Sequence, residues 1–327
     1  MARKTLLRQV MDLQSESEAY ELVERLRWRG HPVCPHCGTE RVVYLTPKAP
    51  EGRKTRTGTV SERRVWKCNQ SPCRKQFSVL TGTIFHGTKV PLKIWLAVVV
   101  EMCANKNGMA AREIERKYGV APKTAWHMAH RVREGMVRRS PHSLLGIIVS
   151  DETWIGGDRS NRHKDVRTME RGFGYDGGKT DKTPVLALIN AATGEVRSAV
   201  VPRVDGTTLR KVMSEQIDMG GSVLWTDEGT HYRKLGQEFA AHQTVNHSED
   251  EYVGPLGQTT NRAEGYFSQL KRSLDGTHHR VSVEHLPRYL AEFDFRYSTC
   301  KLTDDERVSR LMGQVDGRRL SYKRVTR

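Results

Sequence analysis

Two pairs of cysteines constrain the fold of this chain more than any other feature of its sequence. Two residues separate Cys34 from Cys37, four separate Cys68 from Cys73, and 30 residues lie between the pairs. Two close thiolate pairs suit tetrahedral zinc, and the connecting stretch is long enough for a β-hairpin that brings them together. A redox role for the CxxC motif would need an adjacent βαβ pattern, which the sequence does not show. We therefore predict a zinc ribbon in which Cys34, Cys37, Cys68 and Cys73 bind one structural Zn²⁺.

The positive charge is concentrated in the first part of the chain. Residues 1–140 contain 27 Lys and Arg against 12 Asp and Glu, whereas the remaining 187 residues contain 27 against 26. Such asymmetry is typical of a surface that contacts a polyanion such as DNA; a basic surface kept for solubility and a membrane-surface patch are the alternatives. The longest apolar run, Leu92–Met102, is too short to cross a bilayer. No signal segment is visible, so we expect a soluble, cytoplasmic protein.

A helix-turn-helix pattern follows a buried helix predicted at 92–105. One helix can extend to Tyr118, Gly119 fits the left-handed turn that ends it, and Pro122 fits the first position of a second helix. Small apolar residues on one face of this second helix are expected to pack inward. The side chains then left to contact double-stranded DNA are Lys123, Thr124, His127, His130 and Arg131. A helical hairpin used only for packing or dimerisation is the alternative.

From Leu144 onward the sequence changes to short apolar runs. They predict three strands, a helix, a strand, a helix and a last strand. The predicted strands are 145–149, 185–190, 196–201, 223–225 and 244–247, with a helix at 207–219. This order predicts an α/β fold with an RNase H-like mixed sheet, preceded by the zinc ribbon and the helix-turn-helix. The expected segments are 1–85 (N-terminal helix and zinc ribbon), 86–140 (helix-turn-helix), 141–300 (RNase H-like domain) and 301–327 (basic C-terminal tail).

Acidic residues follow two of the predicted strands. Asp151 and Glu152 end the first apolar run, and because strand side chains alternate between faces they cannot both point the same way. Asp227 ends the fourth run. The first and fourth strands of an RNase H-like sheet are neighbours, so acids at these positions would meet at one edge. Acids that merely cap a strand or begin a helix are the common alternative.

A predicted helix near 259–272 supplies a third acid. Tyr266, Leu270 and Leu274 form its apolar stripe. A different face carries Asn261, Glu264, Ser268 and Lys271, although a solvent-exposed helix face can show the same spacing. Three carboxylates can hold two divalent cations, which phosphodiester chemistry requires, and a nearby lysine can contact a phosphate.

With these motifs in place, the chain resembles bacterial insertion-sequence transposases of the DDE type, in the group that carries an N-terminal zinc ribbon. The motifs that carry the resemblance are Cys34-Pro-His-Cys37, residues 77–85, Asp151-Glu-Thr-Trp-Ile-Gly-Gly157, Thr226-Asp227-Glu-Gly, Val245-Asn-His247-Ser and residues 260–272. By position, the resemblance implies Asp151, Asp227 and Glu264 as ligands of two catalytic Mg²⁺ or Mn²⁺ ions, with Lys271 as the accompanying base. Some relatives use Asn for the third acid, so Asn261 stays open as the third ligand.

The expected function is a DNA transposase that binds transposon ends and catalyses two-metal phosphodiester cleavage and strand transfer into target DNA, as a homodimer or larger assembly on DNA. A DNA-binding regulator with an inactive core and a host nuclease or resolvase are the alternatives. Whether the three acids converge within metal-bridging reach would distinguish a transposase from the inactive regulator. Terminal inverted repeats that flank the gene would distinguish it from the host nuclease or resolvase. Residues 156–182 contain six glycines and seven basic residues. We expect this segment to touch DNA, with a disordered surface insertion as the alternative.

Overall fold

The structure, a computed structural model, describes residues 4–47, 53–54, 58, 60–138, 142–156, 182–245, 254 and 257–326. The chain divides into two compact units, one formed by Met1–Val137 with Cys300–Arg327 and the other by Arg138–Thr299. Nearly all of the glycine-rich segment, and the DNA contact expected of it, lie outside the described residues. Within the described chain, no helix combines the length and apolar character that a membrane crossing requires.

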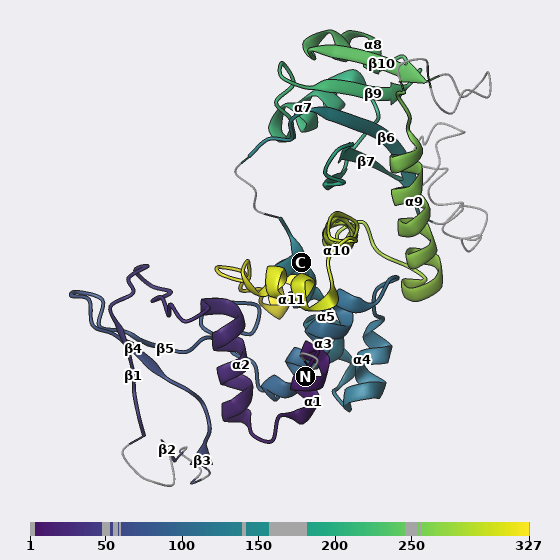
Figure 1. Ribbon diagram of the computed structural model, residues 1–327. Coiled ribbons are helices and arrows are strands. Elements are labelled where there is room, and N and C mark those ends of the chain that lie inside the picture. Colours follow the sequence, from purple (N-terminus) through teal and green to yellow (C-terminus); the bar gives the residue numbers. More distant parts are fainter. Residues whose placement is uncertain are drawn as a thin grey trace. The chain divides into compact units, whose positions relative to one another are not determined.

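The first unit consists of a small ribbon of strands and a group of helices (Figure 1). Its helices are α1 (Leu6–Asp12), α2 (Glu16–Trp28), α3 (Leu92–Ala104), α4 (Ala111–Tyr118), α5 (Pro122–Met136), α11 (Asp304–Met312) and α12 (Tyr322–Val325). Its strands are β1 (Val42–Tyr44), β2 (Arg53–Lys54), β3 (Val60–Ser61), β4 (Trp66–Cys68) and β5 (Gln76–Phe77). Strands β1, β4 and β5 form an antiparallel sheet in that order, and β2 pairs with β3 in a separate hairpin.

Aromatic rings join the ribbon to α2. The ring of Trp28 makes edge contacts with Trp66 of β4, at 5.5 Å, and with Phe77 of β5, at 6.2 Å between centroids. Trp66 donates an indole hydrogen bond of 2.8 Å to Glu24 of α2, and Arg64 pairs with the same carboxylate at 3.0 Å. The ribbon therefore rests on a small aromatic core whose polar edge is also satisfied.

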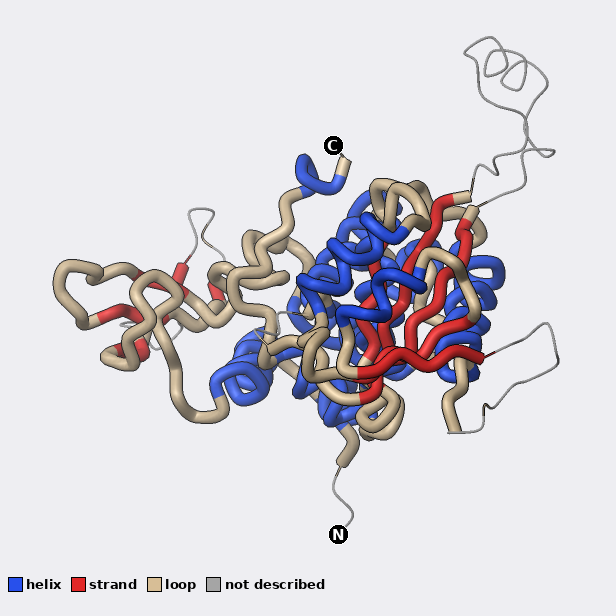
Figure 2. Tube along the Cα trace, turned by 90° about the horizontal axis from the view of Figure 1, so that it is seen from above, coloured by secondary structure: helices blue, strands red, loops and turns tan. Residues whose placement is uncertain are grey.

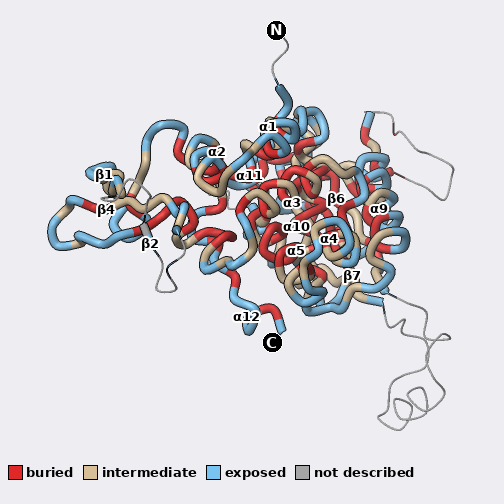
Figure 3. Tube along the Cα trace, turned by 90° about the horizontal axis from the view of Figure 1, so that it is seen from below, coloured by how far each residue is buried: buried red, intermediate tan, exposed pale blue. Residues whose placement is uncertain are grey.

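Helix α3 forms the centre of the helical part, because most of its residues are apolar and buried. Its buried residues are Leu92, Trp95, Leu96, Val98, Val99, Val100, Met102 and Cys103. Helices α1, α2, α5 and α11 all contact it. The C-terminal residues, expected to be a tail, belong to this unit: α11 begins with a capping box of Thr303 and Glu306 and buries Val308, Leu311 and Met312. Figure 3 shows this burial along α3 and α5, and the mostly exposed α12.

The two helices of the predicted helix-turn-helix are α4 and α5. Helix α4 ends at Tyr118, and Gly119 adopts a left-handed conformation with φ of 63°, which glycine reaches without steric cost. Pro122 is the first residue of α5. The predicted helix boundaries at this turn are therefore confirmed.

The second unit contains a five-stranded mixed sheet with helices on both sides, seen as neighbouring red strands among blue helices in Figure 2. Its strands are β6 (Ile147–Ile155), β7 (Thr183–Asn190), β8 (Val196–Val200), β9 (Val223–Asp227) and β10 (Ala241–Val245). Its helices are α7 (Gly206–Gln216), α8 (Tyr232–Leu235), α9 (Asn261–Ser273) and α10 (Leu286–Ser298), with shorter helical turns at Gly236–Glu238 and Leu274–His278.

The strand order is β10-β9-β6-β7-β8. Strand β6 runs parallel to β9, β9 runs parallel to β10, and β7 and β8 are antiparallel to their neighbours. The first and fourth strands are thus adjacent, as the RNase H-like layout predicts. Strand β6 continues beyond its predicted end, because its pairing with β7 extends to Ile155. Asp151 and Glu152 therefore lie inside the strand and not at its end.

Each face of the sheet has its own hydrophobic core. On one face, Val149 of β6 and alternate residues of β7 pack with Tyr266, Phe267 and Leu270 of α9 and with α10. On the other face, Ile148 of β6 packs with residues of α7 and α8. Strand residues alternate between the two faces, so the core that Val149 or Ile148 joins also shows the face of the β6 residues two positions further along.

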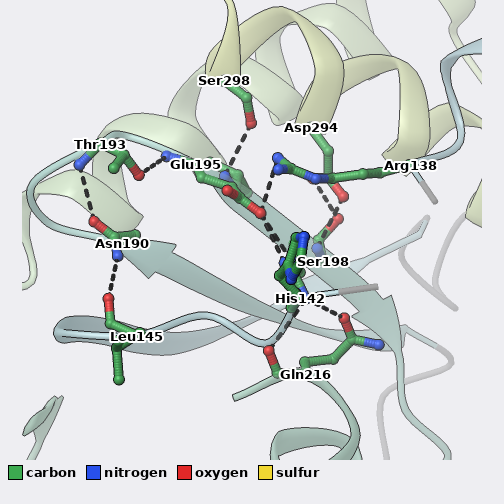
Figure 4. A network of polar contacts seen from close by, with 12 residues as sticks. Arg138, His142, Leu145, Asn190, Thr193, Glu195, Ser198, Gln216, Asp294 and Ser298 are labelled. Atoms are coloured by element: carbon green, nitrogen blue, oxygen red, sulfur yellow. Dashed lines mark hydrogen bonds and ion pairs between the residues drawn. The ribbon is translucent and has the colours of Figure 1, made fainter. Parts of the chain in front are cut away.

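A polar network that includes Ser198, Asp294 and Ser298 joins β8 to α10 (Figure 4). Asp294 of α10 accepts hydrogen bonds from the backbone N–H of Ser198, at 2.9 Å, and from its hydroxyl, at 2.8 Å. Tyr266 of α9 donates to the same carboxylate at 2.7 Å. At the end of α10, Ser298 accepts the N–H of Val196 at 2.9 Å. These bonds hold α9, which carries the third predicted acid, in one position against the sheet.

Candidate active site and metal centre

Four thiols converge in the ribbon. The Sγ atoms of Cys34, Cys37, Cys68 and Cys73 all lie within 4.8 Å of one another. The Cys34–Cys73 and Cys37–Cys68 sulfur distances are 3.9 and 3.6 Å. A tetrahedral zinc ion with Zn–S bonds of about 2.3 Å would place its sulfurs about 3.8 Å apart, far beyond the length of a disulfide. The donor set and its spacing therefore fit one structural zinc ion.

The adjacent acids of β6 point to opposite faces of the sheet. Val149 belongs to the core beneath α9, so Asp151, two residues later, lies on the α9 face. Ile148 belongs to the opposite core, and Glu152 lies on that face together with Ser150. The strand register and the packing therefore show that Asp151, and not Glu152, lies on the α9 face, which alternation alone does not show.

Asp227 and Glu264 approach the α9 face from two other elements. Asp227 is the last residue of β9, and Trp225, two residues earlier, packs against the core beneath α9. Glu264 lies in the first turn of α9, which contacts β6. Its Oε1 accepts a hydrogen bond of 3.3 Å from Thr260. The structure therefore brings the three predicted acids to one face of the sheet, beside the C-terminal end of β9.

The neighbouring acids affect the pKa of Asp151. Burial of its carboxyl group is the main cause that raises the pKa of Asp151 to about 7. The N–H of Glu152 donates a 2.8 Å hydrogen bond that opposes this rise, and the negative charges of Glu152, Asp227 and Glu264 contribute to it. Mutually repelling acids of this kind are stabilised by a bound cation.

The three carboxylates are not gathered as tightly as the four thiols. Among the described residues, the four thiols form the one group of three or more candidate ligands whose atoms all lie within 4.8 Å. Two-metal sites hold their ions about 3.5–4 Å apart, with ligands on both sides, so their outer carboxylates can be separated by more than this distance. The donor chemistry of Asp151, Asp227 and Glu264 fits hard divalent cations such as Mg²⁺ or Mn²⁺.

A second group of polar residues lies on the opposite face of β6, and the sequence analysis did not include it in the site. The buried hydroxyl of Tyr232 donates a hydrogen bond to Glu152, and Ser150 Oγ lies 2.9 Å from the same hydroxyl. Nε2 of His231 lies 3.5 Å from Glu152, and this contact is the first cause that raises the pKa of His231. No spacing rule in the sequence connects residues 152 and 231; only the pairing of β6 with β9 brings them together.

Gly229 separates this histidine from Asp227. Its N–H donates a 3.0 Å hydrogen bond to Oδ1 of Asp227. A Cβ atom at this position would lie 2.6 Å from the ring of His231 and 3.0 Å from the same oxygen. A larger residue would therefore displace either the ring or the carboxylate.

The predicted site residues of α9, Glu264 included, are exposed. Asn261 begins the helix and its backbone N–H donates to Thr259 at 3.2 Å. Lys271 lies seven residues after Glu264, in the last turn of the helix. The predicted apolar stripe is confirmed, because Tyr266, Leu270 and Leu274 are all buried in the core beneath α9.

The residues predicted to contact DNA differ in exposure. Lys123 is exposed and Thr124 is partly exposed in the first turn of α5. His127 is partly buried, with Nε2 at 3.3 Å from the carbonyl of Leu320. His130 and Arg131 are buried, at 0 % and 6 % exposure. Helical periodicity placed these last two on an outer face, but the packing of α5 on its neighbours covers that face.

This chain combines a zinc-ribbon module and two adjacent helices with an RNase H-like sheet that places three acids on one face. Residues 143–298 match the profile of the ISXO2-like transposase domain, and residues 14–76 match that of the transposase zinc-ribbon domain. The chain therefore belongs to the insertion-sequence transposases that join a zinc ribbon to an ISXO2-like transposase domain.

Two individual proteins were also found to be similar. A protein in transposable element ISH50 of Halobacterium salinarum is 27% identical over 288 residues, which cover 86% of this chain and 90% of the relative. A chain in the cryo-EM structure of the simian T-cell lymphotropic virus intasome in complex with PP2A regulatory subunit B56 gamma is 12% identical, with a TM-score of 0.26. That match covers 55% of this chain and 63% of the other.

Proposed function

We propose that this protein is an active DNA transposase that cuts the ends of its element and joins them to target DNA. The observation that carries the proposal is the convergence of Asp151, Asp227 and Glu264 on one face of the RNase H-like sheet, where their charges act on one another. A regulator that only bound DNA would have no need for such a costly group of repelling acids.

The three acids would hold two divalent cations. When bound, the ions would activate the attacking oxygen and stabilise the leaving oxygen during displacement at phosphorus. Asp151 and Asp227 come from adjacent parallel strands, and α9 adds Glu264 from above the same edge. We favour Glu264 over Asn261 as the third ligand, because its negative charge already acts on Asp151. Lys271, two turns further along, would contact a DNA phosphate.

The first unit would bind double-stranded DNA. It holds most of the net positive charge, and the helix-turn-helix and the zinc ribbon both belong to it. Because an element has two ends and each must be cut, we propose that a homodimer or larger assembly forms on DNA. Such a protein would act in the bacterial cytoplasm, at the nucleoid.

The proposed reaction has two steps. In the first, the oxygen of a water molecule bonds to phosphorus at the element's end and the bond from phosphorus to the 3′ oxygen breaks. The element then ends in a 3′-hydroxyl, and the phosphate stays on the flanking DNA. In the second, that hydroxyl attacks a phosphate of the target strand and the broken target bond leaves another 3′-hydroxyl. No covalent bond between protein and DNA is required.

The test is cleavage of labelled DNA that carries the element's own ends, with Mg²⁺ or Mn²⁺. We expect products with 3′-hydroxyl ends, and strand transfer when target DNA is added. Omission of the divalent cation and the Asp227→Asn change should each abolish both steps while DNA binding persists, because the amide keeps the shape of the side chain and removes its charge. Binding without any cutting by the unaltered protein would instead favour the regulator. Cutting that survives in EDTA would exclude the two-metal assignment.

A further inference from the structure

The first unit contains a pocket that the proposed chemistry does not use. Its volume is about 590 Å³, which lies within the range of sites that hold small organic molecules. Three segments distant in sequence form it: residues 86–90 after the ribbon, the N-terminal half of α5, and residues 319–322 near the C-terminus. All three belong to one compact unit.

The lining of this pocket is strongly basic. It includes the cations Lys89, Lys123, Arg131 and Arg319 and, among the described residues that form it, no acidic side chain. Burial, and after it the positive charge of Arg319, together lower the pKa of Arg131 to about 10. Like charges gathered without a counter-ion are the arrangement expected of an anion site.

Arg131 is placed to act on a ligand in this pocket. It is only 6 % exposed, and its guanidinium lies 4.9 Å over the ring of Trp95. One terminal nitrogen donates a 2.7 Å hydrogen bond to the carbonyl of His86. Its Nε is buried and has no hydrogen-bond partner among the described residues. A buried, charged donor left without an acceptor costs free energy unless a ligand supplies one.

The N-terminus of α5 adds backbone donors at the same place. The residue before the helix is Ala121, which offers no side-chain cap, and Pro122 has no N–H, so the backbone donors at this end are the N–H groups of Lys123 and Thr124. Lys123 and Thr124, from this first turn, line the pocket. The positive end of a helix that is 15 residues long favours a phosphate there.

The remaining wall suits a planar ring. Tyr322 is 42 % exposed and makes a perpendicular ring contact with His127 at 5.5 Å. Val90, Met128 and Leu320 also line the pocket. A site for phosphate alone would need neither the volume nor this aromatic and apolar surface, whereas a nucleotide has both a phosphate and a planar base.

We propose that this pocket binds one unpaired nucleotide of a DNA strand, with its base against Tyr322 and its phosphate held by Arg131, Arg319 and the start of α5. The proposal rests on the proposed function in that the protein must bind DNA. Taking one base out of the duplex would mark a defined position along the bound strand, which contacts with paired phosphates alone cannot do.

The test compares two DNA molecules that differ by a single unpaired nucleotide. Fluorescence anisotropy with the full chain would measure affinity for a fully paired duplex and for the same duplex with one bulged nucleotide. We expect the bulged form to bind more tightly. Tyr322→Ala should weaken binding of the bulged form by about 5- to 150-fold and change binding of the paired duplex by less than about twofold. Tyr322→Phe should retain the preference, because it keeps the ring.

Two further measurements test the phosphate and the base of the nucleotide separately. Deoxyadenosine monophosphate should compete with the bulged DNA better than inorganic phosphate does, and Arg319→Ala should weaken this competition while the exposed Arg8→Ala control should not. Equal binding of both DNA forms, or equal competition by phosphate, would overturn the pocket assignment and leave DNA binding intact. Failure to bind either DNA form would overturn the proposed function as well. Unchanged zinc content and thermal unfolding of each variant would show that its fold is retained.

Discussion

Tyr232 and Glu152 are joined by a hydrogen bond between a buried hydroxyl and a buried carboxylate, on the opposite side of β6 from Asp151. Strand β6 therefore carries two consecutive acids with different surroundings. Asp151 faces the charges of Asp227 and Glu264. Glu152 accepts a hydrogen bond from Tyr232 and lies 3.5 Å from Nε2 of His231. This separation leads to a prediction that distinguishes the two neighbours.

Asp151→Asn should reduce cleavage by at least about a hundredfold, because the amide removes a charged metal ligand. Glu152→Gln should reduce it by less than about tenfold, because the amide oxygen can still accept the Tyr232 hydrogen bond. Rates of end cleavage at saturating Mg²⁺, together with calorimetric Mn²⁺ binding, would measure both effects. Loss of metal binding in Glu152→Gln with retention in Asp151→Asn would show that the roles are reversed.

The third ligand can be identified on α9 in the same way. If Glu264 completes the site, Glu264→Gln should lower Mn²⁺ affinity and cleavage by about a hundredfold or more, while Asn261→Ala should leave both within about tenfold. Ser268→Ala, on the same exposed face, serves as the control for general effects on the helix. The opposite ranking of the first two variants would assign the third position to Asn261.

Removing the zinc ion should unfold the ribbon and leave the second unit folded. Cys68 is completely buried in the thiol cluster, so Cys68→Ser should lose stoichiometric zinc and the cooperative unfolding of the ribbon. Cys300→Ser, an exposed cysteine outside the cluster, should keep both. Metal analysis and two-probe thermal unfolding would check this prediction. Retention of one zinc per chain in Cys68→Ser would count against a four-cysteine site.

The stability of the second unit should depend on pH through Asp294. Burial raises the pKa of this carboxyl from 3.8 to about 6, so the folded state holds its proton more tightly than the unfolded state does. The contribution of the protonated Asp294 carboxyl to the free energy of unfolding is complete below about pH 4 and is lost as the pH rises through about 6. Asp294→Asn cannot ionise and should flatten this part of the pH profile, whereas the exposed Asp275→Asn should not. Urea unfolding between pH 4 and 7 would test it; identical slopes for Asp294→Asn and the unaltered protein would refute it.

DNA binding should weaken steeply with salt, through the first unit. Each cation that contacts a phosphate contributes close to one unit to the slope of log affinity against log salt concentration. Lys123→Ala should therefore reduce the slope by about one, and Arg203→Ala, an exposed cation of the second unit, should not. Arg131 is a poor choice for this experiment, because it is buried and its removal would disturb packing. An unchanged slope in Lys123→Ala would remove α5 from the DNA contact.

The sequence by itself determined those features that depend on neighbouring residues. The spacing of Cys34, Cys37, Cys68 and Cys73 predicted the thiol cluster, because a short turn alone brings two sulfurs together. Gly119 and Pro122 predicted where α4 ends and α5 begins, through backbone preferences that act locally. The order of apolar runs predicted the strands of the sheet, and the RNase H-like layout that this order indicated placed the first strand beside the fourth.

Tertiary structure decided whatever depends on segments distant in the chain. Alternation showed that Asp151 and Glu152 must diverge, but only the packing of α9 and α8 on opposite faces shows which one meets the other acids. Periodicity placed Arg131 on an outer helix face, and the approach of Trp95 and residues 319–322 encloses it. The physical reason is that burial depends on which remote surfaces come together, and local patterns cannot determine that.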